Sequence, residues 1–101
     1  MNYKITEAGG TAAVVMDGQL NFASNEDFQT LLINVVAHKP TRVVFDMAAL
    51  TMIDSVGLGL LYIANEDLQA AGAKLALTNV KGAVKRLLDL TEASKTFEII
   101  G

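Results

Sequence analysis

The most informative part of this chain is Leu50-Thr51-Met52-Ile53-Asp54-Ser55-Val56-Gly57-Leu58-Gly59-Leu60, where an apolar strand gives way to an apolar helix. An acidic residue and a hydroxyl, Asp54 and Ser55, stand at this change. Such a junction presents side chains and free backbone N–H groups at one edge of an α/β domain. The stretch therefore predicts a site for phosphate chemistry or for recognition of a partner.

Two short runs typical of strands open the chain. They are Asn2–Thr6 and Thr11–Asp17, and between them lies Glu7-Ala8-Gly9-Gly10, whose paired glycines suit a hairpin turn. We expect Asp17-Gly18 to end the second strand. The chain should therefore begin with an antiparallel hairpin.

The clearest helical pattern follows Ser24, which we expect to cap the helix, with the acidic Asp27 three residues later. Apolar residues then recur at i, i+3, i+4, i+7 and i+8 and predict one stripe along a helix lying on a sheet. These residues are Phe28, Leu31, Leu32, Val35 and Val36. His38-Lys39-Pro40 should end the helix, because proline cannot continue its hydrogen-bond ladder.

The elements around the junction follow from similar patterns. Thr41–Asp46 carries a continuous apolar run, which predicts a strand covered on both faces. A second helix is expected from Ser55 to Ala71, with Gly72 as its C-terminal cap. Lys74–Thr78 predicts another strand.

The rest of the chain predicts a third helix and a last strand. Asn79 is expected to cap a helix over Lys81–Leu90, whose buried face would be Val84, Leu87 and Leu88, and Thr96–Ile100 should form the final strand. The order is β-β-α-β-α-β-α-β. We therefore expect one α/β domain over residues 1–101, with three main helices and a mixed, mostly parallel sheet of about five strands.

Composition excludes several classes of protein. The chain has 101 residues and no cysteine, so disulfides and thiolate chemistry are excluded. No apolar run approaches the roughly 20 residues of a membrane helix, and the first residues do not resemble a signal peptide. The net charge is −3, and the small basic cluster of Lys81, Lys85 and Arg86 does not make the broad footprint that nucleic acid needs. We expect a cytoplasmic protein without membrane insertion and without a nucleic-acid partner.

Metal and hydrolase chemistry lack the residues they need. His38 is the single histidine, which leaves no converging set of metal ligands, and it is expected at the far end of a strand from Ser55. Asp17, Asp46 and Asp54 could follow strand ends, where isolated carboxylates usually make turns and caps.

The glycines of the junction do not make a nucleotide site either. Gly57-Leu58-Gly59 lacks the third glycine, the acidic partner and the lysine of the phosphate-binding motifs. Small residues that pack a helix closely on its sheet explain both glycines. We therefore predict no enzyme activity, no metal and no cofactor.

The helix after the junction has two apolar faces. Leu58, Leu61, Asn65 and Leu68 mark one face, which should point to the core. Val56, Leu60 and Ile63 mark another, with Tyr62 between the two. A helix that is apolar on two sides is either enclosed or offers a contact surface.

Five short motifs in the correct order resemble the STAS domain family, to which the bacterial anti-sigma factor antagonists belong. They are Asp17-Gly18-Gln19-Leu20, Val44-Phe45-Asp46-Met47, Ile53-Asp54-Ser55-Val56-Gly57-Leu58-Gly59, Gly72-Ala73-Lys74-Leu75 and Val84-Lys85-Arg86-Leu87-Leu88. The third is similar to a family pattern of aspartate, two serines, glycine, leucine and glycine. The resemblance covers essentially the whole chain and implies a STAS-like fold.

The resemblance implies a partner switch. In the family, a serine kinase that also acts as an anti-sigma factor phosphorylates the antagonist at the second serine of the pair. The unphosphorylated antagonist captures that kinase and releases its sigma factor, and a phosphatase resets the system. Phosphate brings about 1.5 to 2 negative charges, which a helix N-terminus tolerates but which can repel a partner.

Carried over to this chain, the acceptor position falls on Val56, which has no hydroxyl. Ser55 matches the first serine, and Asn21 stands where the family often has aspartate. Three hypotheses remain open. Binding no longer depends on phosphorylation at the usual position, or Ser55 or Thr51 has become the acceptor, or Ser55 simply caps the second helix.

We therefore expect a non-enzymatic regulator that binds a kinase-type anti-sigma factor through the edge formed by the junction and the Asn21–Ser24 loop. The expected contact residues are Asn21, Ser24, Asp54, Ser55, Val56, Gly57, Leu60 and Ile63. The alternative is a STAS-like structural or regulatory subunit of a larger transport or sensory complex.

Overall fold

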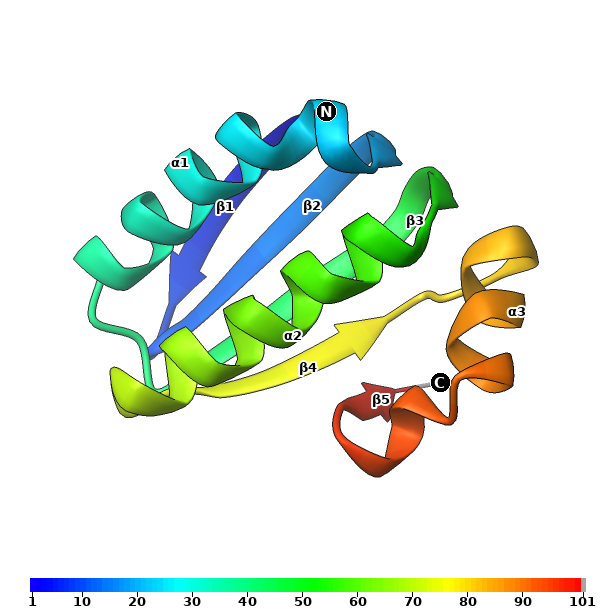
Figure 1. The fold of residues 1–101 in the computed structure, drawn as a ribbon. Helices are drawn as coiled ribbons and strands as arrows, with labels where there is room; N and C mark the ends of the chain where they lie inside the picture. Colours follow the sequence, from blue (N-terminus) through cyan, green and yellow to red (C-terminus); the bar gives the residue numbers. More distant parts are fainter. Residues whose placement is uncertain (101) are drawn as a thin grey trace.

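Five strands form one sheet in which every strand lies beside its neighbour in the sequence (Figure 1). The computed structural model describes residues 1–100 and confirms the expected order of strands and helices. The elements are β1 (Asn2–Ala8), β2 (Thr11–Leu20), η1 (Phe22–Ser24), α1 (Asn25–Ala37), β3 (Arg42–Ile53), α2 (Ser55–Ala70), β4 (Lys74–Thr78), α3 (Gly82–Leu90), η2 (Ala93–Lys95) and β5 (Glu98–Ile100). The two η elements are single turns of 3-10 helix.

The opening hairpin is antiparallel, as expected, and the other strand pairs are parallel. Gly9 and Gly10 connect β1 to β2 with φ angles of 59° and 82°. Two successive positive φ angles fit a two-residue hairpin turn whose twist matches that of the strands. The prediction that Asp17-Gly18 ends β2 was wrong, because the strand continues to Leu20.

The third strand is much longer than the predicted Thr41–Asp46 segment. β3 runs for 12 residues to Ile53, so the first part of the junction is still strand. Its pairing with β2 shifts twice: Val15 pairs with Asp46 but Asp17 with Ala49, and Gly18 pairs with Leu50 but Gln19 with Met52. Each shift puts one extra residue into β3. These bulges interrupt the alternation of side chains that marks a strand in a sequence.

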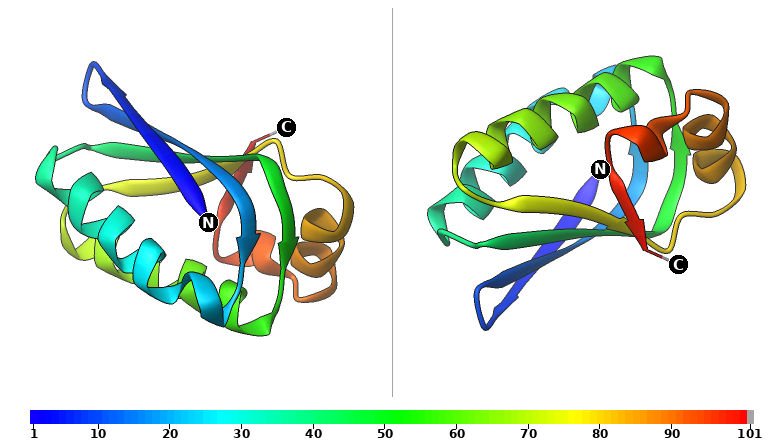
Figure 2. Two further views of the ribbon diagram at one scale, coloured as in Figure 1. Left: turned by 90° about the horizontal axis from the view of Figure 1, so that it is seen from above. Right: turned by 90° about the horizontal axis from the view of Figure 1, so that it is seen from below.

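The helices α1 and α2 lie on the same side of the sheet, and α3 lies beside the end of β3 (Figure 2). This follows from the strand order, because each right-handed crossover adds the next strand at the same edge. The prediction that the strand at Thr41–Asp46 is covered on both faces was therefore wrong: Val43 and Phe45 are buried, whereas Val44 between them is half-buried. Val15 on the same open face of β2 is exposed.

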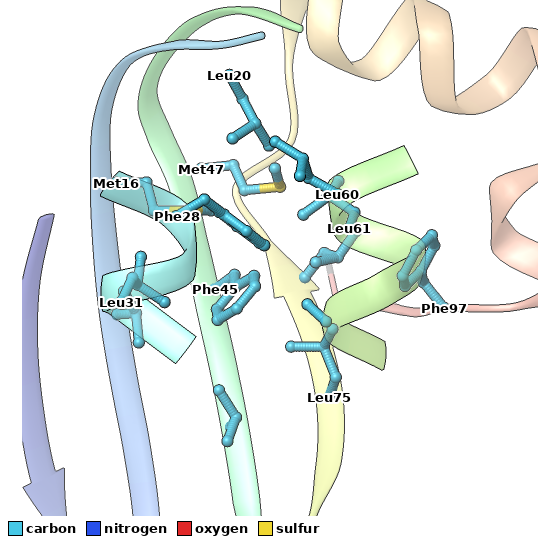
Figure 3. Close-up of a cluster of buried hydrophobic side chains, with 14 of the residues drawn as sticks. Met16, Leu20, Phe28, Leu31, Phe45, Met47, Leu60, Leu61, Leu75 and Phe97 are labelled. Carbon is cyan, nitrogen blue, oxygen red and sulfur yellow. The ribbon is translucent and has the colours of Figure 1, made fainter. Parts of the chain in front are cut away.

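The core lies between the sheet and the helices (Figure 3). Phe28 of α1 meets Phe45 of β3 edge to face, with ring centroids 6.1 Å apart. Tyr62 of α2 packs on Phe97, just before β5, at 5.0 Å. The predicted stripe of α1 is buried except for Val36, which is partly exposed, and the expected core face of α2 is buried. No helix within residues 1–100 has both the length and the apolar character that crossing a membrane requires.

The last helix begins later than predicted. The cap position of α3 is Lys81, so the prediction that Asn79 caps this helix was wrong. Asn79 has a positive φ of 58°, and its Nδ2 donates to Oδ1 of Asp46 at 3.0 Å. Its side chain therefore ties the end of β4 to β3. Val84 and Leu88 are buried as expected, whereas Leu87 is half-buried.

Candidate partner-binding site

Two loops meet where the parallel strands β2 and β3 end. Leu20 and Ile53 are paired in register, so the carboxyl ends of both strands lie side by side at the same end of the sheet. The backbone N–H of Asp54 donates to the carbonyl of Leu20 at 3.4 Å and joins the two loops. The structure thus places the Asn21–Ser24 loop beside the start of α2, and the single turn η1 packs against that helix.

Gly57 explains how closely α2 approaches the end of β2. A Cβ atom at this position would overlap the carbonyl group of Leu20 and would lie 2.9 Å from Cγ1 of Ile53. The prediction that a small residue packs the helix on the sheet is therefore confirmed at Gly57. It was wrong at Gly59, where a Cβ would meet nothing within 4 Å.

Asp54, and not Ser55, caps α2. Oδ1 of Asp54 accepts a hydrogen bond from the backbone N–H of Gly57 at 2.8 Å, and the Asp54 carbonyl accepts from Leu58 N–H at 2.9 Å. The prediction that Ser55 caps the helix was therefore wrong. Ser55 is the first residue of the helix, its side chain is exposed, and within residues 1–100 its hydroxyl makes no hydrogen bond.

Ser24 holds the neighbouring loop in place. Its Oγ donates to the carbonyl of Gln19 at 2.6 Å and accepts from the backbone N–H of Asn21 at 3.3 Å. Ser24 occupies the predicted N-cap position of α1, but its side chain makes no capping hydrogen bond to that helix, because it turns back to the loop. Asn21 Nδ2 also donates to Oε1 of Gln19 at 3.3 Å, so the loop is fixed at both ends.

Burial divides the predicted contact residues into two groups. Ser24, Gly57 and Leu60 are buried, so they shape the surface and their side chains offer little to a partner. Asn21 and Asp54 are partly exposed, and Ser55 is exposed. Val56 and Ile63 are 43% and 51% exposed, so both apolar side chains are accessible to a partner.

Phe22 is a surface residue that the apolar periodicity of the sequence does not reveal. It lies in η1, next to Asn21, and is 74% exposed. An aromatic residue between a polar loop residue and the small Ala23, outside any apolar stripe, was the signal that could have identified it. We call Phe22, Ser55 and Val56 the junction patch, since these exposed residues lie on η1 and on the start of α2, two segments that contact each other.

The other candidate groups do not come together as a reaction centre. Thr51 is exposed on β3, and its Oγ1 donates to the carbonyl of Gly18 at 2.9 Å. Asp46 accepts from Ala48 N–H and from Asn79, as a carboxylate at a bulge does. His38 follows the end of α1, at the other end of β3 from Ser55. Within residues 1–100 no group of His, Asp or Glu side chains is arranged to hold a metal ion.

Comparisons with known proteins agree with this fold. The family model described as STAS domain matches residues 2–100. A STAS-domain containing protein of Pseudomonas aeruginosa (strain UCBPP-PA14) is 26% identical over 91 residues, which are 90% of this chain and 89% of that protein.

Solved structures share the fold at lower identity. An anti-sigma factor antagonist from Mycobacterium paratuberculosis superposes with a TM-score of 0.85 at 24% identity, over 97% of this chain and 83% of that one. A sulfate transporter family protein from Wolinella succinogenes gives a TM-score of 0.78 at 18% identity, over 93% of this chain and 79% of that one. The fold is thus common to regulators and to a transporter family protein.

Proposed function

Because the chain belongs to the STAS domain family, we propose that it is a non-enzymatic regulatory protein that resembles the anti-sigma factor antagonists and binds a kinase-type anti-sigma factor in the cytoplasm. The family assignment and the similarity to an antagonist structure support a regulatory role. The observation that carries the proposal is the junction patch, where two exposed apolar side chains lie at the edge that the resemblance assigns to the partner.

The junction patch has the properties of a protein contact surface. Phe22 and Val56 keep apolar area in water beside the capped start of α2, and covering that area with a partner is favourable. Aromatic residues supply much of the binding energy in protein interfaces. The hydrogen bonds of Ser24 and Asp54 hold both loops in one arrangement, so little conformational entropy is lost on binding.

Val56 determines whether phosphorylation at the usual acceptor position can control binding. It is the second residue of α2 and lacks a hydroxyl, so the usual acceptor position of the family cannot carry phosphate here. We therefore propose that binding at this edge does not depend on phosphorylation of position 56. The exposed Ser55 stays a candidate acceptor, because its hydroxyl is not engaged in capping.

A binding experiment with matched variants tests the proposal. The protein is used to recover partners from the native lysate, and the recovered kinase-type ATPase is purified and titrated with wild type, Val56→Asp and Phe22→Ala. We expect each variant to weaken binding at least about tenfold. Val15→Asp is the control, because Val15 is also 43% exposed but lies on the open face of the sheet. Recovery of no such ATPase, or equal weakening by Val15→Asp, would contradict the proposal.

The second candidate is a subunit of a larger transport or sensory complex. The similarity to the sulfate transporter family protein favours it. Under this alternative, the same purification recovers transporter or receptor components instead of the ATPase. The two candidates therefore give different results in one experiment.

A further inference from the structure

A groove runs between the two helices that cover the first part of the sheet, α1 and α2, which lie side by side in Figure 1. Two adjoining hollows of about 230 and 380 Å³ share Leu32, Ile33 and Asp67 in their walls and so form one continuous depression. Leu32 and Leu60 are buried at its base, whereas Ile33 and Ile63 are 70% and 51% exposed. The core does not use these two isoleucines, so the groove is an apolar surface open to water.

The dimensions of the groove suit an α-helix. On α1 its lining extends from Asn25 to Val36, and on α2 from Leu60 to Ala70. At 1.5 Å per residue, the lined part of α1 is about 16 Å long, which corresponds to about three helical turns. Amphipathic helices bind in grooves of this kind through apolar residues spaced three and four apart.

The charges around the groove favour a bound helix that carries basic residues. Neither α1 nor α2 contains a lysine or arginine, although the chain has eight. Glu26, Glu66 and Asp67 lie on these helices, and Asp67 lines the groove itself. Within residues 1–100 none of these three carboxylates takes part in an ion pair. A basic segment would therefore be attracted, whereas a second copy would bring like charges together.

We propose that this groove binds an amphipathic helix of a partner protein, with an apolar face of leucine-type residues and lysine or arginine along its flanks. The helix would be a second contact, separate from the junction patch, and for the identity of the partner this inference rests on the proposed function. The chemistry of the site follows from this chain alone: an isoleucine on each wall, leucines at the base, the carboxylate of Asp67 in the lining and no lysine or arginine on either helix.

Designed peptides test the inference without the natural partner. A fluorescent helical peptide of about 16 residues carries leucines at i, i+3, i+4, i+7 and i+11 and lysines beside them. A second peptide has the same leucines and glutamates in place of the lysines. We expect the basic peptide to bind the wild-type protein in the micromolar range by fluorescence anisotropy, and the acidic peptide at least about tenfold more weakly.

Variants of the protein locate the binding site. Ile33→Asp should weaken the basic peptide at least about tenfold, and Asp67→Asn about twofold to fivefold. Leu90→Asp is the matched control, because Leu90 of α3 is 73% exposed and does not line the groove; binding should be unchanged. Circular dichroism of each variant verifies that it is folded.

Three outcomes would overturn the inference. The first is that the basic peptide does not bind, and the second is that it binds Ile33→Asp as well as wild type. The third is a dimer that Ile33→Asp converts to monomers, because the groove would then belong to a second copy. If Ile33→Asp still binds the kinase-type ATPase with wild-type affinity while the basic peptide does not bind wild type, the groove inference alone fails and the proposed function stands.

Discussion

Asp54 and Ser55 are neighbours at the start of α2, but only Asp54 bonds to the helix through its side chain. Replacing Asp54 with alanine leaves the N–H of Gly57 without its partner. We expect Asp54→Ala to lower the free energy of unfolding by about 1 kcal/mol, and Asp54→Asn to restore most of it, because asparagine is also a good cap. Ser55→Ala should change stability by less than about 0.5 kcal/mol. Urea denaturation followed by circular dichroism measures all three, and a larger loss in Ser55→Ala than in Asp54→Ala would contradict this assignment.

Val56 is the residue at which phosphorylation can be restored. Its side chain is exposed at the second position of α2, near backbone N–H groups that favour an anion. We expect Val56→Ser to gain one phosphate when incubated with the cognate kinase and ATP, measured by intact-protein mass spectrometry. Wild type and Val56→Ala should gain none at this position. Labelling of wild type that Ser55→Ala removes would instead identify Ser55 as the acceptor.

The sequence could predict that Asp54 and Ser55 stand at the start of a helix, but not which of the two caps it. Asp54 and Ser55 are both good capping residues, so local preference cannot choose between them. The backbone of Asp54 is extended and its N–H bonds to Leu20 of β2, so the helix begins one residue later, at Ser55. Phe22 escaped prediction because its exposure depends on the turn η1, which has no periodic pattern. The helix positions Leu58, Leu61 and Leu68 were predictable, since a 3.6-residue period determines a buried face directly.

Helix α2 contains two glycines, and replacing each by alanine should change the stability of the protein in opposite directions. Gly57→Ala would push a methyl group into the backbone of Leu20, so we expect a loss of about 1 to 3 kcal/mol in the free energy of unfolding. Gly59→Ala meets nothing within 4 Å and improves helix propensity, so we expect a gain of about 0.5 to 1 kcal/mol. Chemical denaturation of the pair gives the comparison, and destabilisation by Gly59→Ala would show that this helix is less open than described.

Strand β3 was predicted only in its first half, whereas its neighbour β4 was predicted in full. β4 was predicted with its observed bounds, because a short apolar run between turn residues marks it clearly. β3 has two bulges in its second half, where Ala48 and Ala49 are both exposed and the period of two is lost. Its pairing with β2 holds that half in the sheet, and such long-range pairing leaves no local pattern in the sequence.

At the scale of the whole molecule, one core joins the two edges of the sheet. Tyr3 lies on the edge strand β1, where its hydroxyl accepts from Asn34 at 2.9 Å, and Tyr62 packs on Phe97 beside the other edge. The chain has two tyrosines and no tryptophan, so when one tyrosine is replaced by phenylalanine the fluorescence of the variant comes from the other tyrosine. We expect thermal unfolding of Tyr3→Phe and of Tyr62→Phe to give the same midpoint by tyrosine fluorescence as by circular dichroism, because the core is continuous.

Different midpoints by tyrosine fluorescence and by circular dichroism would contradict this prediction. If the fluorescence of Tyr62 changes at a lower temperature than the circular dichroism, the part of the chain around β5 opens before the rest. A separate early change of Tyr3 would mean the same for the β1 hairpin. Either difference would contradict a single cooperative transition.

The order of the strands allows the sheet to form step by step while the chain is being synthesised. The sheet grows from β1 to β5 in sequence order, so no strand has to enter between two strands that are already paired. During synthesis, each new strand can add to the open edge left by the previous one, and its helix then covers the apolar face that the pair has just created. A nascent chain built in this way exposes one growing edge at a time, and it completes the end of β3 together with the candidate site before β4 and β5 leave the ribosome.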